Sequence, residues 1–331
     1  MSDSGFSFII PAFNAQSSIG GTLQAIYIAI SNSSIKEFEI IIVNDGSTDG
    51  TDLTVKNMGL HDVKIINQLN QGRLQARLNG IYAAKHQNLI FLDSRVWTDH
   101  YAVVNLETIL LKNQPKMVIS KILFSSTNLL GIFWDAVTRI VWRKYYRDNE
   151  DIVLTLENFD YYPKGTTLLY VKKEVILEAY GRLTKEQLRN KNTNDDTLII
   201  KSIVEKYEVL LSKNFVGYYF PREKFKPFLG HAKHRGYVAS EGYFAIGTSG
   251  RRWLISVSLI IMSLAIISFR FSEIKMAMLL VTVAIELYFF KLISFRHWLS
   301  LNVYTVPFLL SYFLGFFQYK LDQLKLRSPS P

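Results

Sequence analysis

The chain has 331 residues, of which 49% are hydrophobic and 14% are aromatic. It contains no cysteine, which excludes disulfides and thiolate metal sites. The formal net charge of +10 suits a membrane protein whose basic residues face anionic lipid. Nucleic acid is not expected as a partner, because no stripe of Lys and Arg with interleaved aromatic residues is present. The polar start and the early Pro11 predict no signal peptide.

Up to about Phe228 the chain alternates short apolar runs with segments of helical periodicity. The predicted strands are Phe6–Ile10, Phe38–Val43, Val63–Ile66 and Leu89–Leu92. The predicted helices between them are Ser17–Ser31, Asp49–Met58 and Arg73–Ala84. This order predicts an α/β, Rossmann-like fold, with a mostly parallel sheet and helices on both faces. Ligands of such sheets bind beyond the carboxyl ends of the strands, where Pro11–Asn14, Asn44–Ser47 and Asp93–Arg95 are expected.

The composition changes near Gly250, after which three long apolar runs follow one another. Trp253–Phe269 and Trp298–Tyr319 carry no charge, and Met276–Phe290 contains only Glu286. A membrane helix needs about 20 apolar residues. We therefore predict an N-terminal domain over 1–250 and a membrane domain over 251–331, with about three transmembrane helices near 253–269, 274–293 and 298–319.

Basic residues predict the orientation of these helices. Arg251 and Arg252 precede the first apolar run, so the N-terminal domain is expected in the cytoplasm, at a prokaryotic plasma membrane. Three crossings would then place Lys320, Lys325 and Arg327 outside, which the same rule disfavours. Either the last segment does not simply cross the membrane, or the rule fails here.

The segment Val43–Thr51 carries the strongest chemical signal of the sequence. Asp45 ends a predicted buried strand and is followed at once by Gly46 and by hydroxyl residues. Its carboxylate could accept hydrogen bonds from a nucleobase or from ribose hydroxyls at the ligand edge of the sheet. An ordinary Asp-Gly turn followed by a helix cap is the structural alternative.

Further motifs give Asp45 a context. Pro11-Ala12-Phe13-Asn14 follows the first strand, Asn44-Asp45-Gly46-Ser47 the second, Arg77 lies on the next helix, and Leu92-Asp93-Ser94-Arg95 ends a further strand. In this order and spacing the chain, from about Phe6 to Gly242, resembles the family 2 glycosyltransferases. The resemblance implies a GT-A fold, a nucleotide-diphospho-sugar donor such as a UDP- or GDP-sugar, and inverting transfer.

The resemblance also implies roles for individual residues. The loop around the nucleobase would contain Pro11, Phe13 and Asn14, and Asp45 with Gly46 would contact the base or ribose. Arg77 matches the arginine of the Ala-Arg-Asn-x-Gly helix near the donor. Here the asparagine of that motif is displaced by one position, to Asn79, which puts its usual role in doubt.

The main departure from the family lies at Asp93-Ser94-Arg95, where an Asp-x-Asp motif usually binds a divalent cation. The leaving diphosphate accumulates negative charge that a cation must stabilise. We expect Asp93 to hold Mg²⁺ or Mn²⁺ together with waters and phosphates. In the competing interpretation, Arg95 contacts the diphosphate directly, or it only forms a structural ion pair with Asp93.

A second carboxylate pair, Asp195-Asp196, begins a helix predicted over Thr197–Glu205 and matches the family's Glu-Asp motif. The resemblance implies that Asp196 takes the proton of the acceptor hydroxyl, with Asp195 beside it. Plain acidic residues at a helix N-terminus are the alternative. Arg235 is the candidate for a basic segment that reaches the diphosphate in relatives.

Two further features leave alternatives open. His231 and His234 are spaced for a metal on one helix face, but no third ligand is evident, so exposed or interfacial histidines are favoured. Leu129–Tyr146 is rich in aromatic and basic residues, and is either an interfacial helix on lipid headgroups or a helix packed on the N-terminal domain.

These observations together predict a membrane-anchored glycosyltransferase that acts on a lipid-linked or surface-glycan acceptor, in polysaccharide or cell-envelope synthesis. A polyprenyl-phosphate sugar synthase is the first alternative. It is weakened by Asp195-Asp196, because a phosphate acceptor needs no base. A catalytically silent member that binds nucleotide sugar or a partner is the second, and only the altered Asp-x-Asp motif supports it.

Overall fold

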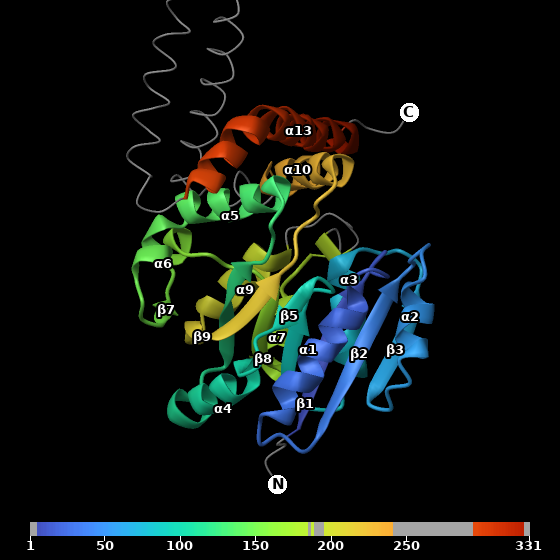
Figure 1. The fold of residues 1–331 in the computed structure, drawn as a ribbon. Coiled ribbons are helices and arrows are strands. Elements are labelled where there is room, and N and C mark those ends of the chain that lie inside the picture. The colour runs from blue at the N-terminus through green and yellow to red at the C-terminus, as the bar shows by residue number, and fades with distance from the viewer. Residues whose placement is uncertain (1–4, 185–186, 189–194, 241–293, 328–331) are drawn as a thin grey trace, which may run out of the picture. The chain divides into compact units, whose positions relative to one another are not determined.

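The structure is a computed structural model that describes residues 5–184, 187–188, 195–240 and 294–327. The chain divides into two compact units (Figure 1). The first unit contains Met1–Ser125 and Asp148–Phe220, and the second contains Ser126–Arg147 and Pro221–Pro331. The composition break near Gly250 and the helices predicted near 253–269 and 274–293 lie outside the described residues, so the domain division predicted there stays a prediction.

The first unit is built on a nine-stranded sheet of order β3-β2-β1-β4-β8-β6-β9-β5, with β7 paired to β9. The strands are β1 (Phe6–Ala12), β2 (Phe38–Asp45), β3 (Val63–Gln68), β4 (Asn88–Leu92), β5 (Val96–Thr98), β6 (Met117–Phe124), β7 (Ile152–Leu154), β8 (Leu168–Lys172) and β9 (Val209–Tyr219). The helices are α1 (Ile19–Ser31), α2 (Thr51–Asn57), α3 (Arg73–Ala83), α4 (Ala102–Asn113), α7 (Lys173–Gly181) and α9 (Asp195–Val204).

The N-terminal part of the sheet has the predicted topology. Strand β1 pairs in parallel with β2 and β4, and β2 pairs in parallel with β3. Each of the four predicted strands and three predicted helices is present, with bounds that shift by a few residues. The rest of the sheet is mixed, because β8 runs antiparallel between β4 and β6. The α/β fold class is thus confirmed.

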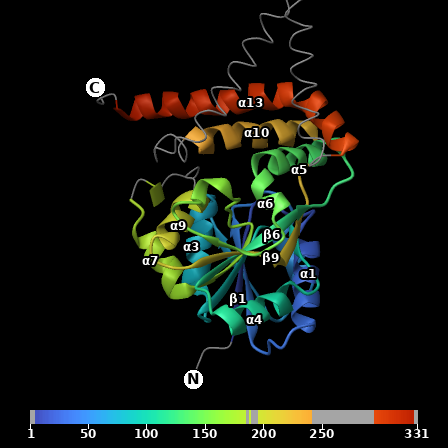
Figure 2. The same cartoon turned by 90° about the vertical axis from the view of Figure 1, so that its left-hand side faces the viewer.

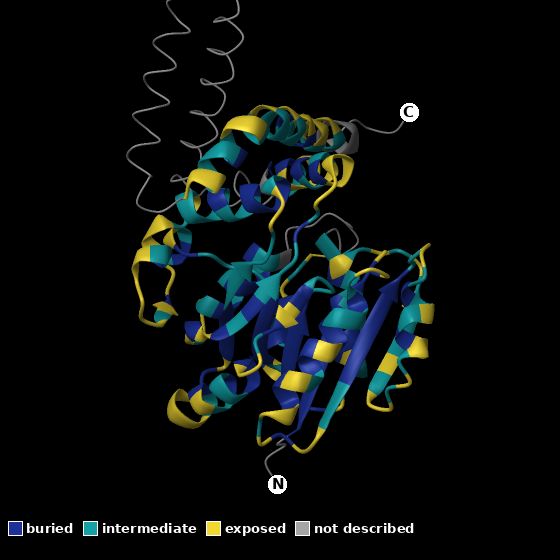
Figure 3. Cartoon of the chain, viewed as in Figure 1, coloured by how far each residue is buried: buried dark blue, intermediate teal, exposed yellow. Residues whose placement is uncertain are grey.

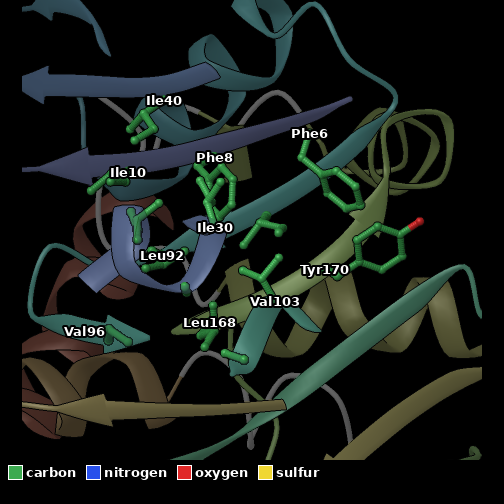
Figure 4. Close-up of a cluster of buried hydrophobic side chains, with 14 of the residues drawn as sticks. Phe6, Phe8, Ile10, Ile30, Ile40, Leu92, Val96, Val103, Leu168 and Tyr170 are labelled. Carbon is green, nitrogen blue, oxygen red and sulfur yellow. The ribbon is translucent and has the colours of Figure 1, made fainter. Parts of the chain in front are cut away.

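Side chains of β1 alternate between the two faces of this sheet, as the period of a strand requires. Phe6, Phe8 and Ile10 enter a buried cluster that α1 and α4 complete (Figure 4). Ile9 points to the opposite face, where Gly80 of α3 packs so closely that a Cβ there would overlap it. Figure 2 shows α1 and α4 on one side of the sheet and α3, α7 and α9 on the other. The two helical layers bury both faces of β1 and most of β2.

The second unit is helical, with α5 (Leu129–Val141), α6 (Arg143–Arg147), α10 (Phe225–Ala239) and α13 (Phe295–Arg327). Its apolar centre joins Phe133 of α5, Phe228 of α10 and Phe308 of α13. The imidazole Nε2 of His297 lies 2.8 Å from Asp135 Oδ2 and ties the start of α13 to α5.

The third predicted transmembrane segment, 298–319, falls within α13. Among the described residues α13 is the one helix long and apolar enough to cross a membrane, over Phe295–Asp322, and only 17% of its most apolar window is buried.

Candidate active site

Asp45 lies at the end of β2 and is only 4% exposed. Its carboxylate accepts hydrogen bonds from Gln68 Nε2 at 2.7 Å and from the backbone N–H groups of Gln71 at 2.7 Å and Gly72 at 2.9 Å. Gly46 has φ +72° in the left-handed region, and a Cβ there would come within 2.7 Å of Asn70 N. The Asp45-Gly46 turn therefore fixes the loop Gln68–Gly72. The predicted contact of Asp45 with a base or ribose stays a prediction.

The loop after β1 is bonded to the loop after β2. The Asn14 N–H donates to Ser47 Oγ at 3.0 Å, and the Thr48 N–H donates to Asn14 Oδ1 at 2.9 Å. Pro11 is the partner of Val43 in the β1–β2 ladder, so the two loops start at the same level of the sheet. Phe13 stays 52% exposed beside them. An aromatic ring held at the ligand edge and left uncovered is free to stack on a planar group.

Arg77, on α3, is 1% exposed and lies between two carboxylates from distant parts of the chain. Its Nη1 donates to Asp196 Oδ1 at 3.0 Å, and its Nη2 donates to Asp93 Oδ1 at 3.2 Å. Nη2 also lies 3.3 Å from the carbonyl oxygen of Thr166. Asp93, Asp196, Thr166 and Arg77 form one group, here called the Arg77 cluster. The structure thus brings together the residue predicted to hold a cation and the residue predicted to act as base.

The two carboxylate oxygens of Asp196 have different surroundings. Oδ1 accepts from Arg77 and from the Thr166 hydroxyl, whereas Oδ2 lies 3.5 Å from Nη2 of Arg73. The Asp196 side chain is 20% exposed, so solvent or a substrate can approach it. Anchoring at Oδ1 fixes the direction of Oδ2, which is the geometry a general base requires. Asp195 is the first residue of α9, and its side chain lies outside what the structure describes.

Asp93 follows β4, and its backbone N–H donates to Thr167 O at 2.9 Å. The Asp93 side chain is 24% exposed, and Arg95 is half-buried. Within the part of the chain that is described, no group of three or more His, Asp or Glu side chains could hold a metal. Asp93 is the carboxylate that this strand end offers to a divalent cation. One carboxylate with substrate phosphates and water is a known arrangement for Mg²⁺, so these residues fit such an ion.

Three participants in the site were not predicted from the sequence: Arg73, Thr166 and the loop Gln68–Gly72. Thr166 precedes the apolar strand β8, and polar residues before a strand are too common to mark a site. Arg235 belongs to the second unit, where it is exposed and its Nε lies 3.4 Å from His231 Nε2. Its predicted role at the diphosphate stays a prediction.

The sheet and its helical layers form the GT-A fold of glycosyltransferases. Two solved structures have this fold. The mannosyltransferase PcManGT from Pyrobaculum calidifontis, in complex with GDP-Man and Mn²⁺, superposes with a TM-score of 0.60 at 14% identity and covers 94% of this chain and 86% of that one. Residues 1–349 of S. aureus TarS, in complex with UDP, give a TM-score of 0.52 at 14% identity, covering 97% and 92%.

The sequence comparison gives the family. Residues 7–170, which include Asp45, Arg77 and Asp93, match the model of glycosyl transferase family 2, and this part of the chain belongs to that family. It is 27% identical over 192 residues to the glycosyltransferase GlyA of Streptococcus pneumoniae, which is 56% of this chain and 25% of that protein. It is 30% identical over 92 residues, 27% of this chain and 21% of the relative, to the poly-β-1,6-N-acetyl-D-glucosamine synthase of Staphylococcus epidermidis. The chain thus spans about a quarter of the length of these curated relatives.

Proposed function

We propose that this chain transfers a sugar from a nucleotide-diphospho-sugar, a UDP- or GDP-sugar, to the hydroxyl group of a lipid-linked or surface-glycan acceptor, with inversion at the anomeric carbon. The observation that carries this proposal is the Arg77 cluster, in which one buried guanidinium holds both Asp93 and Asp196. The complexes of relatives with GDP-Man and UDP support the donor class.

In the proposed reaction the acceptor oxygen attacks the anomeric carbon and the bond from that carbon to the diphosphate oxygen breaks. Asp196 Oδ2 receives the proton of the attacking hydroxyl, while the Oδ1 contacts to Arg77 and Thr166 keep the carboxylate in place. The nucleoside diphosphate leaves with the bonding electrons. Phe13, Asn14 and the loop Gln68–Gly72 would hold the nucleotide, with Asp45 supporting that loop.

The leaving diphosphate needs positive charge beside it. Asp93 would hold a divalent cation, Mg²⁺ or Mn²⁺, which supplies Lewis-acid stabilisation of that diphosphate when it is bound. Arg95, two residues along, adds a cation that the Asp-x-Asp pattern lacks. Arg77 keeps the two carboxylates at a fixed separation, and its charge offsets their mutual repulsion.

Anchoring to a membrane, with the catalytic unit in the cytoplasm, is the second part of the proposal. Its supports are the apolar runs after Gly250, the basic residues that flank them and the length of α13. The similarity to a poly-β-1,6-N-acetyl-D-glucosamine synthase favours a glycan acceptor and a role in polysaccharide synthesis.

The test is acceptor-dependent release of nucleotide by purified protein in membranes, with a panel of UDP- and GDP-sugars. We expect one donor class to be consumed, and Asp196→Asn to lower turnover by about 100-fold or more with donor affinity nearly intact. Asp195→Asn is the matched control. A crippled Asp195→Asn beside a near wild-type Asp196→Asn would move the base to Asp195.

The same assay separates the alternatives. Full turnover of Asp196→Asn with a polyprenyl phosphate acceptor would indicate a polyprenyl-phosphate sugar synthase. Donor binding without any turnover across the panel would indicate a silent member of the family.

A further inference from the structure

Helix α13 is fixed along one face to α10. A Cβ added at Gly236 of α10 would overlap the carbonyl of Tyr312, and one added at Gly315 would overlap the carbonyl of Lys233. The two backbones are therefore in contact near the middle of α13. The hydroxyl of Ser311 also donates to Leu229 O at 2.8 Å. This face of α13 is occupied by protein.

Figure 3 shows exposed residues along α13. On the face opposite α10, the exposed residues include an apolar stripe that no described residue covers. Its members, here called the outer stripe, are Val303, Val306, Leu310, Leu314, Phe317 and Leu321, each between 49% and 62% exposed. Their spacing of three or four residues places them within an arc of about 80° over about 27 Å of helix. A continuous exposed apolar surface of this kind marks a contact with another apolar phase.

The charges of α10 and α13 indicate whether the outer stripe contacts lipid or a protein partner. Lys226, Lys233 and Arg235 lie in α10, and Arg296, Lys320, Lys325 and Arg327 in α13, against one acidic residue, Asp322. An apolar stripe on a cationic pair of helices is the pattern of a helix at an anionic lipid surface. A protein partner would need acidic groups around an apolar groove, whereas anionic headgroups over acyl chains supply both features.

The contact with α10 argues against a transmembrane α13. Gly315 lies about 10 Å along the axis from the middle of Phe295–Asp322, which is within the roughly 15 Å half-thickness of the hydrocarbon layer. A crossing would hold the adjacent Lys233 and the nearby exposed Arg235 inside hydrocarbon, where charged side chains are costly and rare. If α13 instead lies in the plane of the membrane surface, Lys233 and Arg235 stay in water.

We propose that α13 lies in the plane of the membrane, with the outer stripe immersed at the boundary of headgroups and acyl chains of an anionic leaflet. With two crossings near 253–269 and 274–293, Arg251 and the C-terminal cations Lys320, Lys325 and Arg327 all remain on one side. The conflict with the positive-inside rule then disappears. This inference rests on the membrane attachment proposed above and not on the transfer reaction.

The absence of cysteine makes a direct test possible. Single cysteines at Val303, Leu310, Leu314 and Leu321 are labelled with a nitroxide in the full chain, which is reconstituted in vesicles of phosphatidylethanolamine and phosphatidylglycerol. Collision with oxygen and with a water-soluble nickel chelate then gives the depth of each label. We expect all four labels at one shallow depth, about 5–10 Å below the headgroups. A label at the exposed Gln318, off the outer stripe, is the aqueous control.

Two results would overturn the proposal. A depth that is greatest at Leu310 and Leu314 and falls to opposite surfaces at Val303 and Leu321 would show that α13 crosses the membrane. Low access of both oxygen and nickel at all four positions would show that protein covers the outer stripe, either a second copy or another segment of this chain. Nucleotide release by the same samples is scored separately, so a failed transfer reaction leaves the depth profile interpretable.

Discussion

Replacing Arg77 tests the centre of the candidate site. Arg77→Met removes a buried cation that Asp93 and Asp196 share, with contacts at 3.2 Å and 3.0 Å. Breaking a buried ion pair costs about 3–5 kcal/mol. Because the two carboxylates are 24% and 20% exposed, water can reach them, and we reduce the expected loss to about 2–4 kcal/mol.

Arg77→Lys is the sharper variant, because it keeps the charge. A lysine ammonium is a single compact donor group and cannot reproduce the planar fork that reaches both carboxylates. Losing one of the two bonds should cost about 1–2 kcal/mol of stability. Asp196 Oδ1 also loses an anchor, and a misplacement of the base by about 1 Å should lower kcat by about 100-fold. KM for the donor should change much less.

The assay pairs urea unfolding with kcat and KM from nucleotide release. Arg73→Lys is the matched control, since Arg73 is 40% exposed and 3.5 Å from Asp196, and it should stay within about 0.5 kcal/mol of wild type. Wild-type stability and turnover in Arg77→Lys would refute the idea that this guanidinium positions both carboxylates.

Three further predictions concern other residues. Asp45→Ala should lose about 2–4 kcal/mol of stability, because the N–H groups of Gln71 and Gly72 and the amide of Gln68 lose their buried acceptor, and calorimetry should find nucleotide binding abolished; unchanged affinity in a folded variant would contradict this. Asp93→Ala should lose nucleotide-dependent Mn²⁺ binding in titration calorimetry, while Arg95→Ala should keep it and turn over more slowly; full activity after exhaustive chelation would remove the cation from the mechanism. Burial, together with the nearby positive charge of Lys121, lowers the pKa of Lys213 to about 8. Between about pH 8 and 10.5 the folded state therefore binds fewer protons than the unfolded state, and the free energy of unfolding rises with pH. Lys213→Met should thus be stabilising at pH 7 and lose that advantage by pH 10 in thermal unfolding; a difference independent of pH would show that Lys213 does not titrate in this range.

The sequence predicted those strands, helices and turns that are specified by residues close together in the chain. The β-branched runs of β1 and β2 and the turn Asn44-Asp45-Gly46 specify strand, edge and loop within a few residues of chain. Strand β8 was not predicted, since a short apolar run gives no indication of its antiparallel place between β4 and β6. That place brings Thr166 to Asp196, a contact that depends on long-range topology.

Site residues were predicted from their positions in the family motifs, but their partners were not. The resemblance predicted Arg77 near the donor, and the sequence contains no sign that this side chain would be 1% exposed between two carboxylates. An arginine at this position is compatible either with a surface contact to phosphate or with a buried ion pair. Only the packing of α3 against the sheet distinguishes the two.

The path of the chain between its two units determines whether the second unit can be removed by truncation. The chain passes from one unit to the other after Ser125, after Arg147 and after Phe220, so the second unit contains a segment inserted within the first. Removing residues 253–331 would leave Phe133 and Phe228 without Phe308, their partner on α13. Such a fragment would keep an uncovered aromatic surface and should aggregate. The second unit is therefore not a module that a single cut between residues 252 and 253 would remove intact.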